Sequence, residues 1–401
     1  MNHRSAAGVQ TPPIDARALA QAGVDALRRG DAREARKLFE RIAAAGQADA
    51  SAYVALAYAC SGLHDHSAAL AAADQALALE PQNLRALIIK ADHLAAQGDA
   101  RAACAFYGAA VDAAPPANQL PADLRDEVAR ARALRERYAA EFGAFLRDRL
   151  ARQGLVEPRA SSRFRDSIDI LTGTKKIFFQ EPRHYFFPGL PQIQFYDRNH
   201  FPWLDKVEAA TADIRAELVA VLKDESAFEP YVESQPGRPD KEQAGMLNNP
   251  DWSAFYLWKH GEIVPQNAAR CPNTMRAMAE VPLGRVKNRS PSVLFSLLRP
   301  GARIPPHTGE VNTRLICHLP LIVPGDCGFR VGNDSRALVE GKAWVFDDTI
   351  EHEAWNRSNG TRVILLFEIW RPELTEEERR LVSAMFEAID DYSGVTPARE
   401  I

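Results

Sequence analysis

Residues 304–323, IPPHTGEVNTRLICHLPLIV, contain a strand that is polar on one face and apolar on the other. Successive side chains of a strand point to opposite faces, so Arg314, Ile316 and His318 share one face. The residues between them, such as Cys317, are apolar and belong to the other face. A cation inside an apolar strand is costly to bury unless it is paired. The pattern therefore predicts a barrel whose polar face looks into a lumen that holds an anion.

The stretch at 345–372, VFDDTIEHEAWNRSNGTRVILLFEIWRP, continues this pattern and puts Arg362 and Glu368 on one face of its last strand. From about residue 290 to 371, runs of valine, isoleucine, leucine and phenylalanine alternate with glycine, asparagine and aspartate. That composition is typical of short strands joined by turns. It favours an all-β jelly roll or cupin-like barrel, a double-stranded β-helix.

Helices are expected on both sides of this barrel. Residues 204–223 have the composition of a helix, and a second helix is expected over 375–391. Thr375 is a suitable N-cap for the second helix, with Glu378 three residues later to complete a capping box. Residues 235–250 are polar, contain glycine and proline, and predict a loop.

The N-terminal part carries an internal repeat. The triplets Gly30-Asp31-Ala32, His64-Asp65-His66 and Gly98-Asp99-Ala100 follow one another every 34 residues, with an alanine four positions after each aspartate. This is the period of tetratricopeptide (TPR) repeats, in which helix pairs bury their apolar faces only against their neighbours. The repeat predicts a docking surface for a peptide or protein, or else a scaffold or dimerisation arm.

The chain is therefore expected to have an α+β, multidomain fold. Residues 15–116 form three TPR-like units, and residues 117–154 form a connecting segment. Within that segment, 121–153 has apolar residues at helical spacing and predicts one long helix that caps the repeats. Residues 155–401 form the second domain, with the barrel and its flanking helices.

Charge and cysteine content exclude some functions. With 49 basic and 53 acidic residues the net charge is −4, which argues against a nucleic-acid binder that relies on bulk charge. Runs of about 18 apolar residues are missing, so we expect no membrane span. Residues 1–19 have no apolar core, so we expect no secretory signal. The five cysteines are scattered, without a CxxC pair, which indicates a reducing, cytoplasmic setting.

Two histidines and an arginine form the candidate site. His307 and His352 lie at the shoulders of strands, and Arg362 follows ten residues after the second histidine. Two imidazoles can hold Fe(II), and a guanidinium can hold a carboxylate in a bidentate manner. The usual facial triad adds a carboxylate two residues after the first histidine. Here that residue is Gly309.

The longer strings around these residues resemble the aspartyl/asparaginyl β-hydroxylases, a family of Fe(II)- and 2-oxoglutarate-dependent oxygenases. The resemblance covers about residues 160–385 and is strongest over 290–374. The stretches that carry it are FPGLPQIQFYDRNHFPWL, DWSAFYLW, SLLRPGARIPPHTGEVNTRLICHLPL, VFDDTIEHEAW and IWRPELT. The resemblance implies an oxygenase domain, with Fe(II), 2-oxoglutarate and O2 as its cofactors. TPR repeats also precede this domain in several members.

The resemblance assigns roles at the metal and at the distal end of the cosubstrate. His307 and His352 match the two iron ligands of the family. Members typically lack the carboxylate ligand, and Gly309 agrees with that. Arg362 and Ser296 match residues that bind the distal carboxylate of 2-oxoglutarate.

Further roles concern the pocket and the substrate. His318 matches a residue near the other carboxylate of 2-oxoglutarate, and Trp252 matches an aromatic residue of the same pocket. Arg314 matches a basic residue close to the substrate. One departure stands at Ile316, where characterised animal members have a second arginine. The charge that would recognise a substrate carboxylate is therefore reduced.

Several alternatives remain at single residues. Glu310 follows Gly309 directly and could be a third ligand, but strand alternation points it away from the metal. Asp347 and Asp348 precede the second histidine and are interpreted as turn formers, with the alternative that they support a ligand imidazole.

The function expected is hydroxylation of the β-carbon of an Asp, Asn or related residue in a peptide or protein docked by the repeats. One alternative keeps this chemistry on a small molecule, a carrier-bound intermediate or a lipid acyl chain. Another is a non-catalytic TPR interaction protein. The glycine at the carboxylate position also leaves room for a halide, as in iron halogenases.

Overall fold

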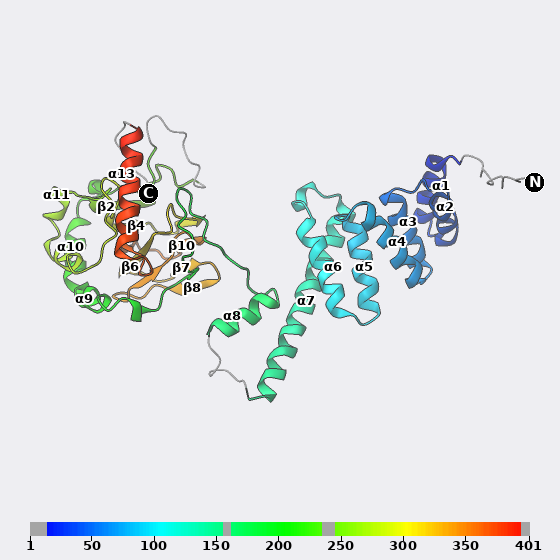
Figure 1. The fold of residues 1–401 in the computed structure, drawn as a ribbon, viewed down its shortest axis with the longest axis horizontal. Helices are drawn as coiled ribbons and strands as arrows, with labels where there is room; N and C mark the ends of the chain where they lie inside the picture. Colours follow the sequence, from blue (N-terminus) through cyan, green and yellow to red (C-terminus); the bar gives the residue numbers. More distant parts are fainter. Residues whose placement is uncertain (1–13, 155–161, 235–244, 394–401) are drawn as a thin grey trace, which may run out of the picture. The chain divides into compact units, whose positions relative to one another are not determined.

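The protein is described by a computed structural model, which covers residues 14–154, 162–234 and 245–393. The chain divides into two compact units, Met1–Lys175 and Lys176–Ile401 (Figure 1). The division lies further along the chain than residue 155, where the sequence placed the start of the second domain. The loop expected at 235–250 falls mostly outside the described residues.

The first unit consists of helices, as expected. Each of the first six packs against the next along the chain, so that they form three antiparallel pairs. Their bounds, with those of the two helices that follow, are α1 (Ala16–Arg28), α2 (Ala32–Ala44), α3 (Ala50–Gly62), α4 (His66–Leu79), α5 (Leu84–Ala96), α6 (Ala100–Ala113), the 3-10 helix η1 (Ala117–Gln119), α7 (Ala122–Arg152) and α8 (Ser162–Leu171).

The 34-residue repeat has a local cause. Asp31, Asp65 and Asp99 are the N-caps of α2, α4 and α6, and each accepts a hydrogen bond from the backbone N–H three residues later. The residue before each aspartate has a left-handed backbone, with φ of +79°, +57° and +83°. That residue is glycine in the first and third units and His64 in the second. A sharp turn and a capped start thus recur in every unit.

The long connecting helix is also confirmed. α7 runs from Ala122 to Arg152 and ends before Gly154, whose φ is +77°. Its N-terminal half packs on α6 and α5 through Val128 and Ala131. The structure thus agrees with a helix that caps the repeats.

The second unit contains two antiparallel sheets. A seven-stranded sheet has the order β1-β2-β4-β11-β6-β9, with β3 paired to β2, and a four-stranded sheet has the order β5-β10-β7-β8. The strands are β1 (Glu229–Pro230), β2 (Trp252–Lys259), β3 (Glu262–Ile263), β4 (Val293–Leu298), β5 (Arg303–His307), β6 (Arg314–Ile322), β7 (Cys327–Val331), β8 (Asp334–Ala337), β9 (Trp344–Phe346), β10 (His352–Asn356) and β11 (Arg362–Trp370).

Helices flank these sheets (Figure 1). They are η2 (Arg198–His200), α9 (Leu204–Ala209), α10 (Thr211–Val221), η3 (Glu225–Ala227), α11 (Pro265–Ala268), α12 (Pro272–Met278) and α13 (Glu376–Ser393). Thr375 and Glu378 form the expected capping box at the start of α13.

The single helix expected over 204–223 is wrong. The chain breaks at Ala210, whose ψ is 0°, into α9 and α10. The hydroxyl of Thr211 donates to the carbonyl of Glu208 at 2.6 Å. A side-chain bond of this kind competes with the helical ladder, which composition alone does not reveal.

The two faces of the large sheet pack against different elements. On its outer face, residues such as Cys317 and Leu365 pack against α9, α10 and α12. On its inner face, Ile316 and Ile364 pack against Phe329 of the small sheet. The alternation predicted for β6 and β11 is confirmed. The polar residues at alternate positions with Ile316 and Ile364, which are Arg314, His318, Arg362 and Glu368, therefore point into the space between the sheets. Among the described residues, every helix is too short or too polar to cross a membrane.

Candidate active site

His307 and His352 face each other in the small sheet. Strands β5 and β10 pair antiparallel with these two residues in register. The centroids of their rings lie 4.1 Å apart. Two residues 45 positions apart in sequence thus become neighbours through strand pairing.

Backbone carbonyls fix the tautomer of both rings. The Nδ1 of His307 lies 2.8 Å from the carbonyl oxygen of Pro305, and the Nδ1 of His352 lies 3.1 Å from that of Ile350. A carbonyl oxygen only accepts, so each Nδ1 carries the proton and each Nε2 keeps its lone pair. Burial lowers the pKa of both imidazoles, which keeps them neutral. Neutral imidazoles with free Nε2 lone pairs are the form that binds a metal ion.

The turn between β9 and β10 explains why residue 309 is glycine. A Cβ atom at Gly309 would clash with the carboxylate of Asp348, and the two residues are also joined by a backbone hydrogen bond of 2.7 Å. Asp348 is 6 % exposed, and burial raises its pKa to about 7, which Arg314 opposes. The carboxylate beside the first histidine therefore comes from the segment before the second one.

The acidic neighbours divide between two roles. Asp347 accepts from the N–H and the hydroxyl of Thr349 and so forms the turn that was expected. Asp348 instead points at Gly309, and its Oδ1 has no hydrogen-bond partner. Glu310 is paired with Arg183 and His184. Among the described residues, there is no group of three or more His, Cys, Asp or Glu side chains that could hold a metal.

A buried cation lies on the inner face of the large sheet. Arg362 is 1 % exposed, and its Nε and Nη1 have no hydrogen-bond partner. Burial lowers its pKa to about 10, so it remains charged at neutral pH. Burial lowers the pKa of His318, and the nearby charge of Arg362 lowers it further. The Nδ1 atom of His318 also has no hydrogen-bond partner. Buried polar atoms of this kind are rare without a ligand to satisfy them.

Ser296 and Trp252 complete this pocket. Ser296 lies opposite Ile364 in the β4–β11 ladder, on the same face as Arg362. The Nε1 of Trp252 donates to the Ser296 hydroxyl at 3.2 Å. The Trp252 ring centroid lies 6.0 Å from that of His307. The structure thus brings all the residues expected to bind a metal or cosubstrate into one space between the sheets.

Arg314 is buried in the same wall but is engaged by acidic residues. Its Nη1 forms an ion pair with Glu368, and its Nη2 lies 3.8 Å from Asp348. Arg314 and Glu368 are 8 % and 5 % exposed. Ile316 lies directly across from Glu368 in the β6–β11 ladder.

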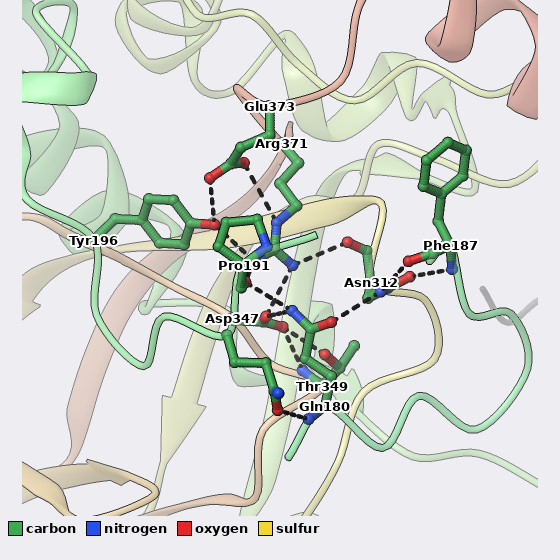
Figure 2. A network of polar contacts seen from close by, with 10 residues as sticks. Gln180, Phe187, Pro191, Tyr196, Asn312, Asp347, Thr349, Arg371 and Glu373 are labelled. Atoms are coloured by element: carbon green, nitrogen blue, oxygen red, sulfur yellow. Dashed lines mark hydrogen bonds and ion pairs between the residues drawn. The ribbon is translucent and has the colours of Figure 1, made fainter. Parts of the chain in front are cut away.

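A buried network holds the two histidine segments together, and sequence reasoning missed it (Figure 2). Arg371 and Asp347, both fully buried, form an ion pair of 2.8 Å. Gln180 donates to Asp347 at 2.7 Å and accepts from Asn312 at 3.0 Å. Arg371 also donates to the Tyr196 hydroxyl at 2.6 Å. The quoted motifs contained four of these residues, but nothing in their spacing showed that they meet.

A dicarboxylate and a divalent metal ion fit these residues. The two free Nε2 atoms could hold the metal, and the unsatisfied guanidinium of Arg362 could hold a carboxylate. The neutral imidazoles are donors that suit Fe(II) among other ions. Buried apolar residues of the two sheets pack around these groups.

Comparison with known families agrees with this architecture. The profile described as Aspartyl/Asparaginyl beta-hydroxylase matches residues 208–372, which contain both histidines and Arg362. Over these residues the chain is similar to the aspartyl/asparaginyl β-hydroxylase family.

Several curated relatives match the same part of the chain. Aspartyl/asparaginyl beta-hydroxylase of Homo sapiens is 34% identical over 36% of this chain and 19% of its own length. Ornithine lipid ester-linked acyl 2-hydroxylase of Rhizobium tropici is 34% identical over 46% of this chain and 62% of its own length. Aspartate beta-hydroxylase domain-containing protein 2 of Xenopus tropicalis is 30% identical over 52% and 55%. The matches thus span between about a fifth and three fifths of these relatives.

Solved structures match the helical unit. PcrH from Pseudomonas aeruginosa is 21% identical, with a TM-score of 0.29, over 33% of this chain and 98% of that one. The first TPR of Spaghetti (RPAP3), bound to an HSP90 peptide, is 17% identical, with a TM-score of 0.26, over 29% and 93%.

Proposed function

We propose that this protein is an Fe(II)- and 2-oxoglutarate-dependent hydroxylase that acts on an Asp, Asn or related residue of a peptide or protein. The observation that carries the proposal is the combination of two imidazoles with free Nε2 lone pairs and one buried, unsatisfied guanidinium. The match of residues 208–372 to a hydroxylase family supports it.

His307 and His352 would hold the metal through Nε2. Arg362, with Ser296 and Trp252 beside it, would hold the distal carboxylate of 2-oxoglutarate, and His318 would approach its other end. When bound, Fe(II) with 2-oxoglutarate and O2 supplies oxidative decarboxylation to succinate and carbon dioxide, with one oxygen atom inserted into a C–H bond.

The chain's own residues contribute orientation and shielding. The Nδ1 hydrogen bonds of His307 and His352 to carbonyls keep the rings from turning. Asp348 offers an unsatisfied oxygen beside the metal-binding histidines, where it can accept a hydrogen bond from a water or a substrate group. Buried residues such as Phe329 and Phe346 keep bulk water away from the pocket.

The helical repeats would dock the substrate chain. A hollow of about 440 Å³ lies between α1, α3, α5 and α7 and is lined by Leu27, Val54, Tyr58, Leu84 and Leu124, with four smaller or polar residues. An apolar hollow with polar groups at its edges suits a short segment of peptide. A variant that fills it, Ala55→Glu, should raise KM for long substrates only, whereas exposed Ala71→Glu should not.

A second candidate keeps the chemistry and changes the substrate to a lipid acyl chain or a small molecule. The Rhizobium tropici relative, whose name describes an acyl hydroxylase, supports this alternative. The apolar residue at position 316 supports it as well, because an acyl chain needs no charged partner.

The deciding experiment is iron-dependent turnover of 2-oxoglutarate by the full chain. We expect succinate to form only with Fe(II), and His352→Ala to abolish both iron binding and turnover. His200→Ala, which changes an exposed histidine of the same unit, should leave both unchanged. Iron binding by His352→Ala at wild-type affinity would contradict the proposed site.

A further inference from the structure

The wall that faces the two histidines contains one ion pair and otherwise mainly apolar side chains. Arg314, Ile316 and His318 of β6 share the inner face with Leu366 and Glu368 of β11. Two cations, Arg314 and Arg362, stand on the described part of this face. Arg362 would hold 2-oxoglutarate, so Arg314 is the remaining cation of this face that a substrate would meet.

Arg314 is already matched by acidic groups of the same chain. Glu368 pairs with its Nη1, and Asp348 lies 3.8 Å from its Nη2. The second oxygen of Glu368 accepts from the backbone N–H of Ser292 at 2.9 Å, which fixes the carboxylate in place. A substrate carboxylate would have to displace a partner that is buried, hydrogen-bonded and covalently part of the chain.

Ile316, beside the Arg314–Glu368 ion pair, adds no charge. Ile316 is 5 % exposed and lies between Glu368 of β11 and Phe346 of β9. Its side chain belongs to the apolar layer between the two sheets. An arginine here would have supplied a second cation next to Glu368, and the isoleucine supplies apolar surface instead.

From these contacts, and resting on the Fe(II)- and 2-oxoglutarate-dependent chemistry of the proposed function but not on its choice of residue, we infer that the group hydroxylated at this site is uncharged. Its substrate class is a chain with a neutral, mainly apolar side group, and an aspartate side chain is disfavoured. The physical reason is that an added carboxylate meets one cation that two carboxylates already share. Burying it there without a partner is costly, whereas a neutral group fills the space beside Ile316 without that penalty.

The test uses the full chain with Fe(II), 2-oxoglutarate and peptide libraries that have randomised flanks and a fixed central residue. The central residue is Asp, Asn, Leu or norleucine. Succinate formation and a mass gain of one oxygen atom at the central residue are both measured. We expect the neutral series to exceed the Asp series by about tenfold or more.

Two variants change the wall in opposite ways and keep the test decisive if one fails to fold. Ile316→Arg adds a cation, and Glu368→Gln releases Arg314 from its partner. Each should raise the Asp series relative to the Leu series by about tenfold. Val339→Arg adds the same charge at a position that is 55 % exposed and should not change this ratio.

The outcomes separate the inference from the proposed function. An Asp series that equals or exceeds the neutral series in the wild type overturns the inference. The inference is also overturned if succinate forms but no neutral series gains an oxygen atom. It is overturned as well if both Ile316→Arg and Glu368→Gln leave the ratio of the Asp series to the Leu series unchanged. Absence of succinate in every series, with every variant, counts instead against the proposed function.

Discussion

The helical unit and the β unit of this protein use polar groups in opposite ways. In the helical unit, aspartates at the helix starts satisfy backbone N–H groups a few residues away, and the core is made largely of alanine. In the β unit, buried charges from distant parts of the chain meet inside the protein, as Arg371 does with Asp347. Local contacts therefore define the first unit, and long-range contacts define the site in the second.

The largest effect is expected from breaking the long-range network. Arg371→Leu removes one partner of a fully buried ion pair and leaves Asp347 unmatched, which should cost about 3–5 kcal/mol of stability in the β unit. Chemical denaturation followed by tryptophan fluorescence measures it, because all six tryptophans lie in this unit. Lys206→Leu, which breaks the exposed Lys206–Glu280 pair, serves as the control and should cost under about 1 kcal/mol. A loss as small as the control's would show that the network is not a structural support.

The second effect separates stability from function at a single residue. Arg362→Met removes a buried guanidinium with unsatisfied donors, so the unliganded protein should gain about 1–3 kcal/mol of stability. Binding of 2-oxoglutarate should fall by a factor of about 100 or more, since the charge-assisted pair is lost. Denaturation and calorimetric titration measure the two effects. Arg357→Met, whose side chain is 69 % exposed, should change neither.

A third effect tests a buried polar contact within the repeats. The Nδ1 atoms of His66 and His93 lie 2.8 Å apart, and the Ser61 hydroxyl lies 2.8 Å from the other nitrogen of His93. Burial, and then His66, lower the pKa of His93 in the folded state, while Asp92 opposes this.

The sign of the pH dependence follows from that shift. A folded pKa below the unfolded value of about 6.5 means that the unfolded chain binds more protons, so stability falls as the pH drops through that value. Thermal unfolding of the helices, followed by circular dichroism, should therefore shift downward by a few degrees between about pH 7.5 and pH 5.5. His93→Gln should reduce the shift. An unchanged shift in that variant would assign it to other groups.

The smallest effect concerns one turn of the repeat. His64 holds a φ of +57° where the equivalent residues of the other two units are glycine. His64→Gly should therefore stabilise the helical unit by up to about 1 kcal/mol, because glycine adopts this conformation without steric cost. His64→Ala removes the ring without relieving the backbone and should bring no gain. Thermal unfolding compares the two variants with the wild type.

The sequence by itself determined the features that depend on near neighbours. The spacing of Asp31, Asp65 and Asp99 predicted three helical units, since a cap acts within one turn. The alternation in β6 and β11 predicted which side chains look inward, because the period of a strand is fixed by its geometry. The sequence did not predict the helix break at Ala210, because the break depends on the hydrogen bond that the Thr211 hydroxyl donates to the carbonyl of Glu208.

Only the tertiary structure decided which distant groups share a partner. It put the carboxylate of Asp348 over Gly309, and it paired Arg314 with Glu368. It also joined Arg371 and Asn312 through Asp347 and Gln180. Each contact depends on strand register and on the course of a loop, and neither leaves a periodic trace in the sequence. The sequence thus named the histidines and the arginine of the site, and folding determined which of its charges remain available to a ligand.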